Sequence, residues 1–88
     1  ADPETSYTAK LFAKGRKKIA QKVGEEAVET ALAAVAEGPQ AVAAESADLL
    51  YHLLVLWADT GVSPDDVWAE LNRRAGVSGI EEKNSRKK

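Results

Sequence analysis

The chain has 88 residues, a formal net charge of −2 and no cysteine. This length suits one small domain, so we expect residues 1–88 to form a single domain. The lack of cysteine excludes disulfides, thiolate zinc sites and a cysteine nucleophile. The single histidine excludes a metal cage built from several histidines. The slightly acidic balance argues against non-specific binding to nucleic acids.

Helix-forming residues dominate the sequence, and the apolar/polar alternation typical of strands is missing. Glycine and proline occur at helix-sized intervals, so we predict an all-α fold with about four helices. Ser6 is a candidate N-cap for a short helix over residues 7–14, which Gly15 ends. A second helix is predicted from about residue 17 to residue 37, just before Gly38.

The third and fourth helices have clear start signals. Pro39 suits the first turn of a helix that runs to about residue 59 and ends near Gly61. Ser63 and Asp66 have the spacing of a capping box, which predicts a fourth helix as far as about residue 74. Beyond the glycines that follow, we expect residues 79–88 to form a flexible basic tail.

The third predicted helix is apolar almost all round between Leu49 and Ala58. A helix of that kind belongs in the middle of a larger structure, but a chain of this size buries only about 60–65% of its unfolded surface. We therefore expect homodimerisation to complete a larger helical bundle. His52, Trp57 and Trp68 are expected in the core or the interface, and packing is the preferred interpretation for the two tyrosines.

No signal peptide or membrane span is predicted. The longest continuous apolar run, from Leu53 to Ala58, is far shorter than the roughly 20 residues that a transmembrane helix needs. We expect a cytoplasmic protein with no membrane partner. Because the sequence has no initiator methionine, we also expect it to be a trimmed form of a longer chain.

Two pairs of acidic residues follow helical spacing on consecutive helices. Glu26 and Glu29 lie one turn apart, as do Glu45 and Asp48. If the helices run antiparallel and the pairs face each other, four carboxylates share one pocket, where a cation would relieve their repulsion. Oxygen ligands of this kind suit Mg²⁺, Mn²⁺ or Ca²⁺. The alternative is a set of solvated surface acids, and Glu25 is ambiguous because it also lies one turn from Glu29.

Basic residues border these acids in the sequence. A run from Lys10 to Lys22 contains no acid, and a second basic group lies between Lys83 and Lys88. A site for a metal–polyphosphate complex requires acids that hold the metal, and cations nearby that neutralise the remaining phosphate charge. The alternative is a solvated charged face or a weak nucleic-acid patch, and we expect no nucleic-acid partner. A phosphate-binding loop of the G-x-x-x-x-G-K-[ST] type is absent from the sequence.

Two stretches carry a family resemblance, namely GEEAVET at residues 24–30 and ESADLLYHLL at residues 45–54. They closely resemble the phosphoribosyl-ATP pyrophosphohydrolase family, which belongs to the all-α nucleoside triphosphate pyrophosphohydrolases of the MazG-like superfamily. The resemblance extends through residues 6–12 and 21–23 and through the tail at residues 78–86. The paired acids mark only the superfamily, whereas these flanking pieces indicate the enzyme family of histidine biosynthesis.

The resemblance implies Mg²⁺-dependent hydrolysis of 1-(5-phosphoribosyl)-ATP to 1-(5-phosphoribosyl)-AMP and pyrophosphate, the second step of histidine biosynthesis, by a homodimer. Mn²⁺ is a candidate substitute, and a separate phosphoribosyl-AMP cyclohydrolase is a candidate partner. Carried over by motif, the metal ligands are Glu26, Glu29, Glu45 and Asp48. The catalytic candidates are Glu25, Glu26 and Glu29, where Glu25 is a further ligand or orients the water. The candidate phosphate contacts are Lys10, Lys22, Lys83 and Arg86.

Two other functions fit the same residues. A house-cleaning hydrolase of non-standard nucleoside triphosphates would keep the acids but would not select for the phosphoribosyl group. A non-catalytic dimerisation module would use the acids only to bind a cation, although the intact double acidic motif argues against it.

Overall fold

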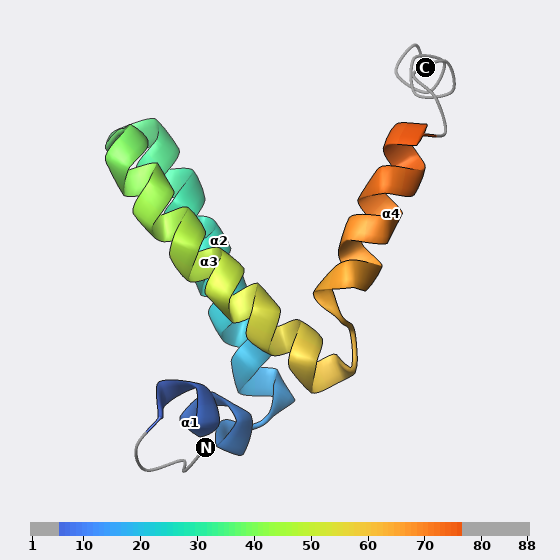
Figure 1. The fold of residues 1–88 in the computed structure, drawn as a ribbon. Coiled ribbons are helices and arrows are strands. Elements are labelled where there is room, and N and C mark those ends of the chain that lie inside the picture. Colours follow the sequence, from blue (N-terminus) through green and yellow to red (C-terminus); the bar gives the residue numbers. More distant parts are fainter. Residues whose placement is uncertain (1–5, 77–88) are drawn as a thin grey trace.

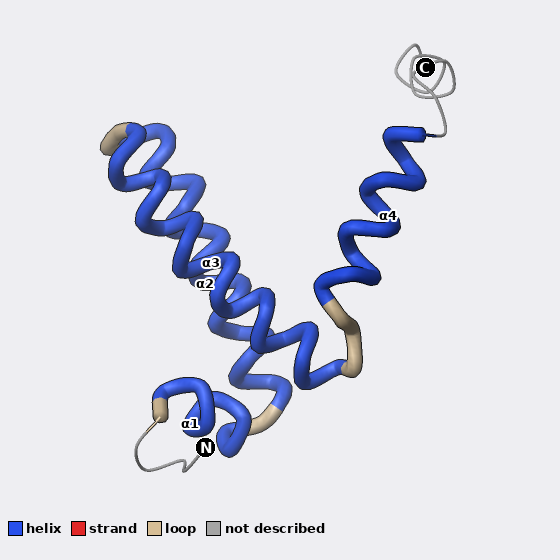
Figure 2. The backbone as a smooth tube through the Cα atoms, viewed as in Figure 1, coloured by secondary structure: helices blue, strands red, loops and turns tan. Residues whose placement is uncertain are grey.

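The structure is a computed structural model, and it describes residues 6–76. These residues form four α-helices and no strand: α1 (Tyr7–Lys14), α2 (Arg16–Ala36), α3 (Pro39–Thr60) and α4 (Pro64–Gly76). Figure 2 shows the helices separated by short connections. The predicted all-α fold is therefore confirmed, and each helix ends within two residues of its predicted position. The predicted basic tail, residues 79–88, lies outside the described residues.

The helix starts follow the capping signals in the sequence. Ser6 Oγ accepts a hydrogen bond from the backbone N–H of Ala9 at 3.2 Å and so caps α1. At the start of α4, the backbone N–H of Ser63 donates to Asp66 Oδ2 at 2.9 Å, and the backbone N–H of Asp66 donates to Ser63 Oγ at 3.3 Å. This reciprocal pair is the predicted capping box. Gly15, between α1 and α2, has φ of 95°, which favours glycine.

Helices α2 and α3 form a long antiparallel hairpin, and α1 packs across the end of the hairpin that is distant from its turn (Figure 1). The small core lies at this end, where Leu11, Ile19 and Val55 are buried and Tyr51 and Leu56 pack against them. The hairpin thus holds α1 against the C-terminal half of α3.

An ion pair joins α2 and α3 at the end of the hairpin where the core lies. Arg16 Nε donates to Asp59 Oδ2 at 2.8 Å, and Arg16 Nη2 donates to the Asp59 backbone carbonyl at 3.0 Å. These contacts connect the first residue of α2 with the last turn of α3. Because the Arg16 side chain is largely exposed, we treat the pair as an orienting contact with little effect on stability.

Helix α4 diverges from the hairpin instead of packing along it (Figure 1). Its contact with α3 includes an edge-to-face pair between Trp57 and Trp68, with ring centroids 6.0 Å apart. None of its described residues is buried, and Trp68 and Leu71 are about half exposed. The core or interface position expected for Trp68 is therefore not reached within one chain.

The hairpin also leaves large apolar side chains in contact with solvent. Val28, Leu32 and Val35 on α2 are 59%, 55% and 83% exposed, and Leu50 and Leu54 on α3 are also exposed. Helix α3 is long and apolar enough to cross a membrane by length and composition, and little of it is buried within the chain. The chain thus covers only part of its own apolar surface within the described residues.

Candidate active site

The antiparallel hairpin brings three carboxylates together. Glu26 and Glu29 lie one turn apart on α2, and Glu45 lies on α3. One carboxylate oxygen from each of the three lies within 4.8 Å of the others. The spacing within α2 puts two of the acids on one face, and the packing of α3 against that face supplies the third. We call Glu26, Glu29 and Glu45 the carboxylate cluster.

The carboxylate cluster is partly removed from solvent, and one of its oxygens lacks a hydrogen bond within the described part of the chain. Glu26 is only 8% exposed. Glu45 Oε1 is buried and has no hydrogen-bond partner among the described residues. Burial, and then the negative charges of Glu29 and Asp48, raise the pKa of Glu45. Negative charge is therefore concentrated around Glu45.

Asp48 lies beside the carboxylate cluster but is not part of it. Its side chain is exposed, although its charge is close enough to help raise the pKa of Glu45. Its backbone carbonyl lies 2.8 Å from Nδ1 of His52. Within one chain, three of the four predicted metal ligands converge, and Asp48 lies one turn further along α3.

Glu25 takes part in a different set of contacts from those of Glu26 and Glu29. It accepts a hydrogen bond from Gln21 Nε2 at 2.7 Å, and its Oε1 lies 3.5 Å from Lys22 Nζ. The hydrogen bond from Gln21 contributes most to lowering the pKa of Glu25, and the charge of Lys22 adds to it. Its carboxylate therefore faces Lys22 and is not part of the carboxylate cluster.

The basic residues proposed to contact phosphate differ in their burial and in their distance along the chain from the acids. The Lys22 side chain is only 30% exposed, and it lies one turn before Glu25 and Glu26 on α2. Tyr7, and then Glu25, raise the pKa of Lys22, so the ammonium remains charged. Lys10 is exposed on α1. Lys83 and Arg86 lie outside the described residues.

Sequence reasoning did not identify a polar link between α1 and α3. The Tyr7 hydroxyl lies 3.1 Å from Nε2 of His52, and Thr8 Oγ1 is hydrogen-bonded to the Tyr51 hydroxyl. The Tyr7 and Tyr51 rings stack with centroids 6.0 Å apart. His52 is 5% exposed, which confirms the prediction that it is buried. No local spacing signals these pairs, because they join residues more than 40 positions apart.

The donors of the carboxylate cluster fit a hard divalent cation. All three are carboxylates, and the unpartnered Glu45 Oε1 leaves one lone-pair donor available in a buried position. Mg²⁺, Mn²⁺ and Ca²⁺ prefer oxygen ligands of this kind, whereas zinc and copper favour nitrogen and sulfur. A cation there would also offset the repulsion among the three acids.

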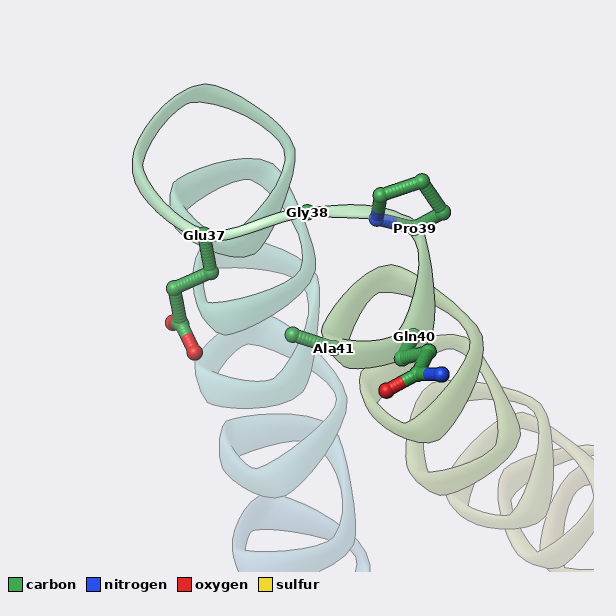
Figure 3. A pocket seen from close by; sticks show the side chains of 5 residues that line it. All are labelled: Glu37, Gly38, Pro39, Gln40 and Ala41. Atoms are coloured by element: carbon green, nitrogen blue, oxygen red, sulfur yellow. The ribbon is translucent and has the colours of Figure 1, made fainter.

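A separate pocket lies at the turn of the hairpin (Figure 3). It is lined by Glu37, Gly38, Pro39, Gln40 and Ala41. Glu37 lies just beyond the end of α2, about two helical turns after Glu29, and no candidate site residue lines this pocket. The chemistry of the carboxylate cluster therefore lies elsewhere on the hairpin.

Comparison with known proteins shows the family of this chain. The sequence model of the phosphoribosyl-ATP pyrophosphohydrolase family (PRA-PH) matches residues 1–75. The chain belongs to this family. The matched range includes all four helices except the last residue of α4, and it therefore contains the whole carboxylate cluster.

Curated relatives carry the same family name. The phosphoribosyl-ATP pyrophosphatase of Rhodospirillum rubrum is 69% identical over 88 residues, which cover 100% of this chain and 75% of the relative. That of Paramagnetospirillum magneticum is 70% identical over 87 residues, 99% of this chain and 80% of the relative. That of Azospirillum brasilense is 68% identical over 87 residues, 99% of this chain and 78% of the relative.

Proposed function

We propose that this chain hydrolyses 1-(5-phosphoribosyl)-ATP to 1-(5-phosphoribosyl)-AMP and pyrophosphate in histidine biosynthesis. The observation that carries the proposal is the carboxylate cluster, which lies inside the region matched by the phosphoribosyl-ATP pyrophosphohydrolase family. Relatives about 70% identical, which align over nearly the whole chain, are named for this activity.

We propose that Glu26, Glu29 and Glu45 hold Mg²⁺, with Mn²⁺ as a substitute and Asp48 completing the site from its edge. The unpartnered, buried Glu45 Oε1 and the raised pKa of Glu45 support a cation at this position. When bound, the ion supplies an activated water, a polarised phosphorus and a stabilised leaving group.

The remaining candidate residues act around that position. Glu25, fixed by Gln21 and Lys22, accepts a hydrogen bond from the attacking water and orients it. Lys22 donates to phosphate oxygens through its charged ammonium. Lys10, Lys83 and Arg86 are further candidates for binding the triphosphate. Water is the nucleophile, so the reaction needs no cysteine or serine nucleophile from the chain.

We also propose that the working protein is a homodimer in the cytoplasm. The exposed apolar side chains of α2, α3 and α4 form the kind of surface that marks an interaction site. Glu45, Asp48 and Asp59 all lie on α3, and burying such charges in a lipid bilayer is costly. The apolar length of α3 therefore suits a helix–helix interface better than a membrane.

The decisive experiment measures pyrophosphate release from phosphoribosyl-ATP with and without Mg²⁺. We expect Mg²⁺-dependent release and much slower turnover of ordinary and modified nucleoside triphosphates. Equal turnover across the triphosphate panel would indicate the house-cleaning hydrolase. No release at saturating Mg²⁺ would indicate the non-catalytic dimerisation module.

A further inference from the structure

Tyr7, the first residue of α1, is half exposed although its ring is held at several points. Within the described part of the chain the residue is 53% exposed. Its hydroxyl lies 3.1 Å from Nε2 of the buried His52. Its ring stacks on that of Tyr51, with centroids 6.0 Å apart and an angle of 24° between the planes. The packing expected for Tyr7 therefore covers only part of the residue.

The residues on either side of the carboxylate cluster indicate the direction in which a bound nucleotide runs. Toward the turn of the hairpin, residues 30–44 contain no lysine, arginine or aromatic residue. Toward α1, Lys22 precedes Glu26 by about one turn of α2 and lies on the same face. Phosphate oxygens bind most strongly to charged donors such as an ammonium. A triphosphate anchored at the cluster therefore extends toward α1.

Tyr7 lies further along the same direction. Its hydrogen-bond partner His52 follows Glu45 by about two turns of α3, so both residues lie on one face of that helix. The rise of an α-helix separates these two positions by about 10 Å. Figure 1 shows α1 at this end of the hairpin. The base of a nucleotide is separated from its phosphates by the sugar, so a base reaches Tyr7 when the phosphates lie at the cluster.

We propose that the exposed ring of Tyr7 is the surface on which the adenine base of the substrate stacks. The inference rests on the proposed function, because it takes the phosphates to be bound at the carboxylate cluster. The contacts with His52 and Tyr51 hold the ring in one orientation before the base arrives, so little conformational freedom is lost on binding. Stacking on an aromatic side chain is favourable for any base, and Tyr7 therefore contributes affinity for the nucleotide.

Tyr7→Leu tests the inference, because it removes the aromatic face and keeps an apolar side chain. We expect KM for phosphoribosyl-ATP to rise about five- to a hundredfold, the range for one base stacked on an aromatic ring. The base lies away from the bond that is cleaved, so kcat should change little. Tyr7→Phe keeps the ring and should recover most of the loss. Phe12→Leu is the matched control, because Phe12 is the other aromatic residue of α1 and is 39% exposed; it should keep the wild-type KM.

Two competitive inhibitors, each measured with Mg²⁺, separate stacking from a structural role of Tyr7. ATP carries the adenine base, whereas tripolyphosphate carries only the phosphates. Tyr7→Leu should raise the inhibition constant of ATP and leave that of tripolyphosphate unchanged. An equal rise for both inhibitors, or a wild-type KM in Tyr7→Leu, would overturn the inference.

NMR of the wild-type protein with ¹³C-labelled tyrosine rings gives a readout that is independent of turnover. The chain has two tyrosines, and Tyr7→Phe identifies the resonances of Tyr7. ATP should shift these resonances, and tripolyphosphate should leave them in place. Unmoved Tyr7 resonances at saturating ATP would overturn the inference even if Tyr7→Leu does not fold, and would leave the proposed function intact. A wild-type protein that releases no pyrophosphate from phosphoribosyl-ATP would overturn the proposed function and the inference with it.

Discussion

The Glu26 carboxylate on α2 and the Glu45 carboxylate on α3 approach within 4.8 Å across the helical hairpin. Acidic side chains are normally exposed to solvent, but Glu26 is only 8% exposed, and Glu45 Oε1 is buried without a hydrogen-bond partner among the described residues. Two acids in this relationship are costly unless a cation or a proton lies between them. Their proximity leads to the first prediction.

Glu45→Gln should abolish most of the activity, because it removes one of three converging charges at nearly constant volume. We expect pyrophosphate release to fall by roughly 10²–10³-fold, while stability without Mg²⁺ is kept or rises. The gain in Tm that Mg²⁺ gives the wild-type protein should shrink, by linkage. Glu37→Gln, on the same hairpin but outside the carboxylate cluster, is the control. Near-parental activity of Glu45→Gln at saturating Mg²⁺ would refute the site.

Asp48→Asn should impair Mg²⁺ binding less than Glu45→Gln does. The reason is geometric, because Asp48 lies outside the group of oxygens that approach within 4.8 Å. Both variants should raise the apparent Kd for Mg²⁺, which is measured by following Tm as Mg²⁺ is added. We expect the increase in Asp48→Asn to be roughly one tenth of the increase in Glu45→Gln. Equal losses in the two variants would favour the symmetrical four-carboxylate pocket that the spacing of the acids predicts.

Gly24→Ala should stabilise the chain. Gly24 lies inside α2, and a Cβ placed there meets nothing within 4 Å. Alanine in a helix interior is favoured over glycine by about 1 kcal/mol, so urea denaturation should report a gain of that order with activity retained. A loss of stability or activity would instead show that another subunit or the substrate approaches the backbone at this residue.

Leu32→Glu should dissociate the proposed homodimer. Leu32 is 55% exposed within one chain, so the substitution costs little in a monomer but places a charge in an apolar interface of a dimer. Sedimentation across a dilution series should show the monomer at concentrations where the wild-type protein is dimeric. Gln40→Glu adds the same charge at an exposed polar position and should leave the dimer intact. A folded wild-type monomer at low micromolar concentration would contradict the prediction.

The loss of thermal stability at acidic pH should depend in part on Glu70. Hydrogen bonds from Arg73 and Arg74 lower its pKa from 4.5 to about 2. Because the folded-state pKa is depressed, the ion pairs stabilise α4 above pH 4.5, and the contribution is lost as the pH falls from 4.5 towards 2. The difference in Tm between wild type and Glu70→Gln should therefore be present at neutral pH, decline across that range, and weaken in high salt. A pH-independent difference would contradict this assignment.

The helices and their ends were predictable because their signals are local. The side chain of Ser6, the positive φ of Gly15 and the capping box of Ser63 and Asp66 act within a few residues of the helix end they define. The spacing of Glu26 and Glu29 is also local, since one turn of any helix places such residues on one face. These features follow from the sequence whatever the rest of the chain does.

The tertiary structure decided which of those local features meet. The rotation of α3 about its axis against α2 brings Glu45 into the carboxylate cluster and leaves Asp48 at its edge. The packing of α1 across the hairpin pairs Tyr7 with His52, which lies 45 residues away. Both outcomes depend on how the apolar faces of the helices pack against one another. Because apolar burial is non-directional, the spacing of residues along the sequence does not predict which faces meet. The sequence by itself therefore determined the helices and the candidate acids, and packing between helices selected the residues that share the site.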